Sequence, residues 1–154
     1  MTTPPQPTAS MPSGHREVTL QRLSPGRYAV TNPRGGAVLI GRGGDADYTA
    51  TELLLAAMAA CTAIDVDEVT SRRSEPDEFT VHGTGTKVSD ELGNRLTDVT
   101  LRFELAFPDT DQGAQAAALV ERVVRLSHDK LCTVSRTVML PTPVRAVVGN
   151  TVID

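Results

Sequence analysis

One uninterrupted apolar stretch, within residues 49–69, constrains the fold more than any other feature. Between Leu53 and Ile64 there is no charge, and Thr62 is the only polar side chain. Ala, Leu and Met favour a helix, and neither Gly nor Pro interrupts the stretch. A helix that is apolar on every side must be buried on every side, and this one is too short to cross a bilayer. We therefore expect a helix covered by protein, with Cys61 near its middle.

Composition excludes several classes of function. The chain has 154 residues, a net charge of −4 and a pI of about 5.3, whereas a nucleic-acid partner would require a basic face. No basic residue precedes an apolar segment at the N-terminus, so we expect no signal peptide and no membrane partner. Two cysteines are too few for a disulfide scaffold. Together these features predict a cytoplasmic protein whose thiols are reduced at rest.

The pattern of turns and periodic segments predicts the fold class. Residues 1–14 are rich in Pro, Thr and Ser and are predicted to be a disordered tail, and residues 15–154 are predicted to be one domain. Strands and helices alternate in an order typical of an α+β fold with antiparallel sheets around two long helices. The expected strands are Glu17–Leu23, Arg27–Thr31, Ala37–Ile40, Phe79–Val88, Leu96–Phe107 and Val144–Ile153, and the second helix spans about Gln112 to Asp129.

A domain of this size has difficulty covering an apolar helix on all sides. Because the chain offers only one further long helix and two groups of strands, we expect a second copy to provide the missing cover. The sequence therefore predicts a homodimer with the 49–69 helix in or near its interface.

The two cysteines, Cys61 and Cys132, leave two interpretations open. Free cysteines are among the most buried residues, and a cysteine among Ala and Leu is commonly a small core residue. A reactive thiol needs access and a lowered pKa, from a nearby cation or a helix N-terminus. Neither condition can be read from the sequence.

Two segments of the chain resemble the signature segments of the OsmC/Ohr family. They are TELLLAAMAACTAIDV around Cys61 and SHDKLCTVSRTV around Cys132. The Glu-Leu-Leu, the Ala-rich approach to the first cysteine and the Val-Ser after the second all match. The order of strands and helices also agrees, from about Arg16 to the C-terminus. The A-I-D-V after Cys61 and the His128-x-x-x-Cys132 spacing are closer to the OsmC-like, YhfA-type branch than to Ohr.

The resemblance implies a thiol peroxidase that reduces organic hydroperoxides and protects against oxidative and osmotic stress. On that interpretation Cys61 attacks the O–O bond and becomes a sulfenic acid, and Cys132 condenses with it to a disulfide. An external dithiol then restores both thiols. The implied fold is an OsmC-like, intertwined homodimer. The alternative is a non-catalytic OsmC-like dimer that binds a small hydrophobic ligand, with structural cysteines.

Two further site residues follow from the resemblance. Ohr-type members carry a Glu ten positions before the first cysteine, a place occupied here by Thr51, and Glu52 is the nearest carboxylate. Glu52 is either catalytic or only part of a Thr49-x-x-Glu52 capping box. The family also places an Arg near the thiolate; Arg27 is the candidate, with Arg42 as the other possibility.

The sequence predicts no cofactor and no metal site. Cys61, Cys132 and His128 would supply only three ligands, and their spacing fits no zinc module. An interaction of His128 with the end of its helix explains that residue better.

Overall fold

A computed structural model describes residues 13–153, which form two compact units. The first unit ends at Ala50 and the second begins at Thr51. Most of the predicted tail, residues 1–12, lies outside the described residues. In the described part of the chain, no helix combines the length and apolar character needed to span a membrane.

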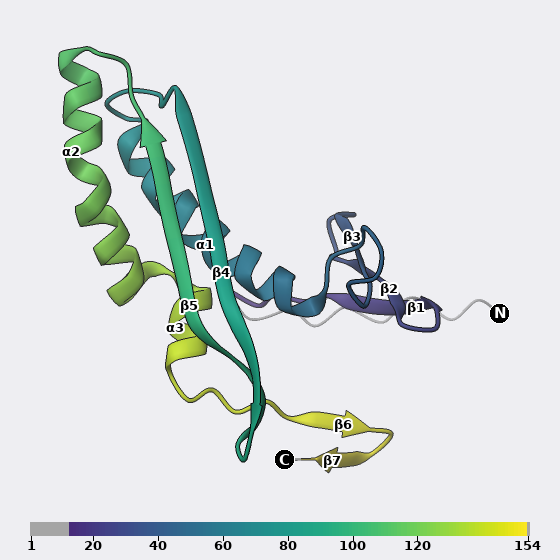
Figure 1. Cartoon of the computed structure of the whole chain (residues 1–154). Coiled ribbons are helices and arrows are strands. Elements are labelled where there is room, and N and C mark those ends of the chain that lie inside the picture. Colours follow the sequence, from purple (N-terminus) through teal and green to yellow (C-terminus); the bar gives the residue numbers. More distant parts are fainter. Residues whose placement is uncertain (1–12, 154) are drawn as a thin grey trace. The chain divides into compact units, whose positions relative to one another are not determined.

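The first unit contains a three-stranded antiparallel sheet in the order β1-β2-β3 (Figure 1). Its strands are β1 (Thr19–Ser24), β2 (Arg27–Thr31) and β3 (Ala37–Ile40). Turn residues separate them as predicted. Gly26 adopts a φ of 76°, which glycine allows without strain, and the Asn32 side chain accepts hydrogen bonds from the N–H groups of Arg34 and Gly36.

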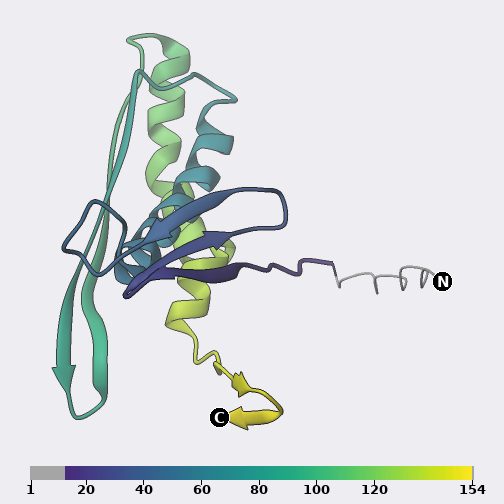
Figure 2. The same cartoon turned by 90° about the vertical axis from the view of Figure 1, so that its right-hand side faces the viewer.

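The second unit places two helices alongside one long β-hairpin, as Figures 1 and 2 both show. Helix α1 comes first, the hairpin follows, and the remaining helices and a short hairpin complete the chain. The elements are α1 (Ala50–Thr70), β4 (Glu78–Asp90), β5 (Gly93–Ala106), α2 (Asp111–Leu126), a π-helical turn η1 (Ser127–Leu131), α3 (Thr133–Met139), β6 (Ala146–Val148) and β7 (Thr151–Ile153). This mixed arrangement with antiparallel sheets confirms the predicted α+β class.

Helix α1 buries one stripe of its surface within the chain, not its whole circumference. The buried residues recur every four positions: Met58, Thr62, Val66 and Thr70. On other faces Leu54 is 39% exposed and Ile64 is 65% exposed. The prediction of burial on every side is therefore not met by one chain alone, because the chain's other elements pack against only part of the helix.

The β4–β5 hairpin packs its apolar face close to α1. Phe79, Val81 and Gly83 of β4 pair with alternate apolar residues of β5, so these side chains share one face. A Cβ at Gly83 would lie 3.4 Å from the carbonyl oxygen of Leu55 on α1. This distance is an ordinary van der Waals contact, so β4 and α1 lie about as close as a small side chain permits.

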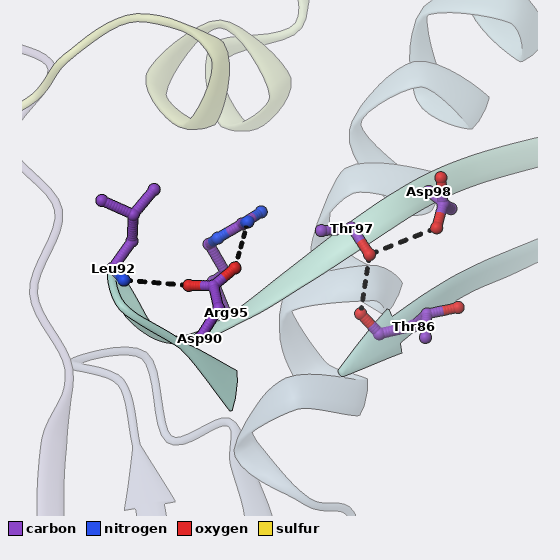
Figure 3. Close-up of polar contacts among 6 residues, drawn as sticks. All are labelled: Thr86, Asp90, Leu92, Arg95, Thr97 and Asp98. Carbon is purple, nitrogen blue, oxygen red and sulfur yellow. Dashed lines mark hydrogen bonds and ion pairs between the residues drawn. The ribbon is translucent and has the colours of Figure 1, made fainter. Parts of the chain in front are cut away.

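The tip of the hairpin is held by one aspartate (Figure 3). The carboxylate of Asp90 accepts a hydrogen bond of 2.9 Å from the backbone N–H of Leu92. It also forms an ion pair with Arg95 on the opposite strand. Gly93 has a φ of 96°, as a tight turn requires. These local contacts fix the register at the turn.

One bulge interrupts the ladder nearer the middle of the hairpin. Thr84 pairs with Thr100 but Thr86 pairs with Thr97, so β5 carries one extra residue there. Within that segment Asp98 has a φ of 54°, which Asp tolerates better than most residues. The Thr97 hydroxyl lies 3.2 Å from the Asp98 carboxylate (Figure 3). Bulges bend a strand and increase its twist, so this one shapes the hairpin along its length.

Helix α2 begins at a side-chain cap. The Thr110 hydroxyl accepts a hydrogen bond of 3.0 Å from the N–H of Gly113, as is usual at a helix N-cap. Gly113 is buried against the preceding loop, and a Cβ at this position would overlap the carbonyl oxygen of Pro108. The first turn of α2 therefore has no room for a side chain at position 113.

The structure corrects two predicted boundaries near the C-terminus. The last strand, predicted over Val144–Ile153, is a hairpin of β6 and β7, because Gly149 takes a φ of 60° and reverses the chain. The second helix, predicted to reach about Asp129, is α-helical only to Leu126 and continues as the π-turn η1. An i to i−5 hydrogen bond from Cys132 to Ser127 closes that turn.

We expect Gly113→Ala to lower the free energy of unfolding by about 1–3 kcal/mol, because the added methyl group overlaps backbone that cannot move cheaply. Urea denaturation followed by circular dichroism would measure this. Gly44→Ala is the control, because a Cβ there meets no atom within 4 Å. Equal stabilities of the two variants would contradict the described packing of α2.

Candidate functional site

Cys61 and Cys132 lie together although they are far apart in the sequence. Cys61 is on α1, and Cys132 stands between the π-turn η1 and α3. The two thiols lie close enough for each to influence the pKa of the other, and both are free thiols in this structure. The packing of the η1–α3 segment against α1 thus forms a site from two helices.

The two thiols differ in their access to solvent. Cys61 is partly exposed, whereas Cys132 is fully buried at 0% exposure. A molecule from solvent can therefore reach Cys61 more readily than Cys132.

The surroundings of Cys61 favour its neutral thiol. Burial is the main reason that the pKa of Cys61 is raised, and Cys132 raises it further. The backbone N–H groups of Val134 and Thr133 oppose this shift because they stabilise a thiolate. Their position marks the place where negative charge on this sulfur would be held.

Cys132 has the opposite balance. Burial raises the pKa of the Cys132 thiol, but hydrogen bonds involving the Ser135 hydroxyl, Cys61, the Ser135 N–H and Thr62 outweigh it and leave that pKa below its usual value. The sulfur lies 3.2 Å from the Ser135 hydroxyl and accepts a hydrogen bond of 3.3 Å from the Ser135 N–H. Within the pair, the pKa of Cys132 is therefore lowered while the pKa of Cys61 is raised.

An apolar cavity of about 250 Å³ lies near the residues that surround Cys132. It lies between α1, β5, α2 and α3, and Thr62 and Ser135, which both hydrogen bond to Cys132, form part of its wall. The apolar wall includes Met58, Leu101, Phe103, Val124, Val138 and Met139. A small apolar group would fit this space, next to two residues that hydrogen bond to Cys132.

Glu52 lies at the start of α1, away from the cysteine pair. It lines a separate hollow between α1 and β4, with Leu55 and Val81 among its neighbours. Nine residues of helix separate it from Cys61, which corresponds to about 13 Å along the axis. Thr49 precedes the first helical residue, so the pair occupies the positions of the predicted capping box.

The two candidate arginines belong to the first unit. Arg27 on β2 forms an ion pair of 2.7 Å with Asp47, and Asp45 is 3.9 Å away. The hydrogen bond to Asp47 is the main reason that the pKa of Arg27 is raised. Arg42 packs its side chain across Gly26. The role predicted for Arg27 beside the thiolate stays a prediction.

His128 is on the π-turn η1 and contributes to the wall of the apolar cavity. Its Nδ1 lies 3.0 Å from Asp129, and that hydrogen bond is the main reason that the pKa of Asp129 is lowered. Among residues 13–153, no three His, Cys, Asp or Glu side chains are arranged to hold a metal ion.

Sequence reasoning did not assign roles to four polar residues that surround the cysteines: Thr62, Asp65, Ser127 and Ser135. Asp65 and Ser135 stand in the matched segments, as the Asp of A-I-D-V and the Ser of the Val-Ser after Cys132. Asp65 is four positions after Cys61, and Ser135 is three positions after Cys132. Residues with this spacing share a helix face, so the sequence could have indicated that each lies near its cysteine.

We expect Ser135→Ala to raise the pKa of Cys132, because it removes a hydroxyl hydrogen bond that stabilises the thiolate. The ultraviolet absorbance of the thiolate, followed against pH, should then rise at higher pH than in the unmodified protein. Thr137→Ala is the control, since its hydroxyl bonds to the carbonyl of Thr133 in the same helix. An unchanged titration in Ser135→Ala would refute the assignment.

Comparisons with known proteins agree with this fold. A family model described as OsmC-like protein matches residues 43–146. An uncharacterized protein of Mycobacterium tuberculosis is 29% identical over 130 residues, covering 83% of this chain and 92% of the relative.

Solved structures extend the comparison. An OsmC-like protein of unknown function from Vibrio cholerae has a TM-score of 0.66 and 14% identity, covering 80% of this chain and 92% of that one. The organic hydroperoxide resistance protein OhrB of Bacillus subtilis has a TM-score of 0.50 and 18% identity, covering 79% and 88%. The matched family model spans most of the chain, including both cysteines, and the chain belongs to the OsmC-like family.

Proposed function

We propose that this protein is a two-cysteine thiol peroxidase that reduces organic hydroperoxides. The observation that supports it is the proximity of a partly exposed thiol, Cys61, to a buried thiol, Cys132, each of which influences the pKa of the other. Membership of a family whose structural neighbours include an organic hydroperoxide resistance protein agrees with this reaction.

In this proposal Cys61 is the nucleophile because it is the accessible sulfur. The Cys132 thiolate takes the Cys61 proton as the Cys61 sulfur attacks the terminal oxygen of ROOH. The O–O bond breaks, the leaving alkoxide takes that proton and departs as ROH, and Cys61 becomes a sulfenic acid. The N–H groups of Val134 and Thr133 stabilise the sulfur's charge during the attack.

The second step forms a disulfide. The Cys132 thiolate attacks the sulfenic sulfur of Cys61, the S–O bond breaks, and hydroxide leaves and is protonated to water. An external dithiol then reduces the disulfide to two thiols and is itself oxidised. The apolar cavity beside Cys132 would receive the alkyl group of the peroxide.

Glu52 and Arg27 complete the proposal with the roles that the family resemblance implies. Arg27 would stabilise the Cys61 thiolate, and Glu52 would be a further catalytic residue. The ion pair between Arg27 and Asp47 would have to open for that role.

We expect Cys61→Ser to abolish consumption of cumene hydroperoxide in the presence of a dithiol, because it removes the nucleophile. Cys132→Ser should permit one oxidation of Cys61 and no disulfide. Arg27→Gln should lower the rate and Arg42→Gln should leave it unchanged. Full turnover by Cys61→Ser would exclude the proposed reaction.

A second candidate function is the binding of a small hydrophobic ligand without catalysis. The apolar cavity of about 250 Å³ favours it. In that case the cysteines are structural, and cumene hydroperoxide should leave both of them as free thiols. Consumption of the peroxide that depends on Cys61 would exclude this alternative.

We also propose that the protein is a homodimer. Leu54 and Ile64 on α1 are exposed in the single chain, and so are the apolar residues of the β6–β7 hairpin. An isolated two-stranded hairpin is marginally stable, so a second copy would stabilise it. Sedimentation equilibrium should give twice the mass of the 16.4 kDa chain. A mass equal to one chain at micromolar concentration would contradict the dimer.

A further inference from the structure

A hydrogen bond between Asp65 and Ser127 joins the two segments that carry the cysteines. The Ser127 hydroxyl donates to the Asp65 carboxylate over 2.6 Å. Asp65 is on α1 and Ser127 is the first residue of the π-turn η1. A short hydrogen bond to a carboxylate is about twice as strong as one between neutral groups.

Asp65 lies on the same face of α1 as Cys61, because the two residues are four positions apart in the helix. That face meets the segment following α2 at two points. One is the bond from Asp65 to Ser127, and the other is the contact of Cys61 with Cys132 and the N–H groups of Thr133 and Val134. Each of these contacts restricts how that segment can turn relative to α1, so the loss of one gives it more freedom.

Ser127 is connected to Cys132 by backbone as well. Its carbonyl accepts the i to i−5 hydrogen bond of 2.9 Å from the N–H of Cys132, which closes the π-turn. Ser127 is fully buried at 0% exposure, so its hydroxyl depends on Asp65 as a partner. A closed ring of contacts therefore runs from Cys61 through Asp65 and Ser127 to Cys132 and back through the thiols.

We propose that Asp65 and Ser127 are positioning residues that hold the sulfur of Cys132 within bonding reach of Cys61. This inference rests on the proposed function for its biological meaning, since it concerns the step in which the two sulfurs join. Neither residue touches the reacting atoms. Without their hydrogen bond, the π-turn loses a direct attachment to α1 and the sulfurs spend less time in contact.

The test follows disulfide formation with two oxidants in the full-length protein. Cumene hydroperoxide reports the proposed reaction, in which the sulfenic acid of Cys61 and the thiol of Cys132 give a disulfide and water. Diamide reports the approach of the sulfurs alone: one thiolate adds to its N=N bond, the second displaces it, and diamide is reduced to the hydrazine. The loss of free thiols with time gives both rates.

We expect Asp65→Ala and Ser127→Ala to slow disulfide formation by diamide about ten- to a hundredfold, because loss of orientation by about 1 Å costs that much in rate. Asp65→Asn should retain most of the rate, since its amide oxygen still accepts from Ser127. The double variant Asp65→Ala/Ser127→Ala should be no slower than either single variant. The rate of Cys61 alkylation should stay within about twofold in all variants, which separates positioning from general loss of structure.

Asp67→Ala is the matched control. Asp67 is on the same helix and accepts a similar hydrogen bond, from Ser71, but at the exposed surface. Its rate of disulfide formation should equal that of the unmodified protein.

The outcomes separate this inference from the proposed function. Unchanged diamide rates in Asp65→Ala and Ser127→Ala would overturn the positioning role, and so would a loss in Asp65→Asn equal to that in Asp65→Ala. If Asp65→Ala does not fold, the comparison of Ser127→Ala with Asp65→Asn still tests the positioning role. If the unmodified protein forms the disulfide with diamide but not with cumene hydroperoxide, the proposed function fails while the variants still test the positioning.

Discussion

The placement of Cys61 depends on one stripe of α1. Met58, Thr62, Val66 and Thr70 are buried along that stripe, and the β4–β5 hairpin, α2 and α3 enclose it. Because the interior of a protein is close-packed, a helix held in this way cannot rotate freely, and the orientation of each side chain on it is fixed. The partly exposed Cys61 therefore faces the η1–α3 segment in a defined direction, which is a condition for any chemistry that needs a second sulfur.

A reactive thiol needs both access to solvent and a lowered pKa, and each of the two cysteines meets only one of these conditions. Cys61 has access to solvent but a raised pKa, and Cys132 has a lowered pKa but no exposure. A single site rarely offers both, because solvent access and a fixed set of hydrogen bonds to a buried sulfur conflict. In the proposed reaction the accessible sulfur attacks the peroxide and the buried sulfur accepts its proton. This is why the order of deprotonation does not by itself identify the nucleophile.

Much of this fold could be predicted from the sequence, because its strongest signals are local. The three N-terminal strands, α1 and the long hairpin follow from turn residues and periodicity, and the structure places them within a few residues of the predicted bounds. The hairpin at Gly149 and the π-turn at Ser127 were missed. A π-turn depends on one extra residue at the end of α2 and has no distinct sequence pattern. The all-round burial of α1 could not be tested by one chain, because burial depends on what else is present.

The candidate site was less accessible to prediction than the fold. The cysteines stood out because the chain has only two, and the family resemblance suggested that they act together. The residues that tune and orient them, Ser135, Thr62, Asp65 and Ser127, are ordinary polar residues whose roles depend on three-dimensional contacts. For Arg27 the residue type and the family resemblance suggested a partner for the thiolate. In the structure its contacts within the first unit are with Asp45 and Asp47.

The most direct test of the account is peptide mapping after the reduced protein receives one equivalent of cumene hydroperoxide and is quenched with acid under non-reducing conditions. The account predicts one new species in which the peptide that contains Cys61 is joined to the peptide that contains Cys132, with no linkage in the untreated sample. Recovery of both peptides as free thiols, with the peroxide unconsumed, would contradict the claim that these two sulfurs form a redox couple.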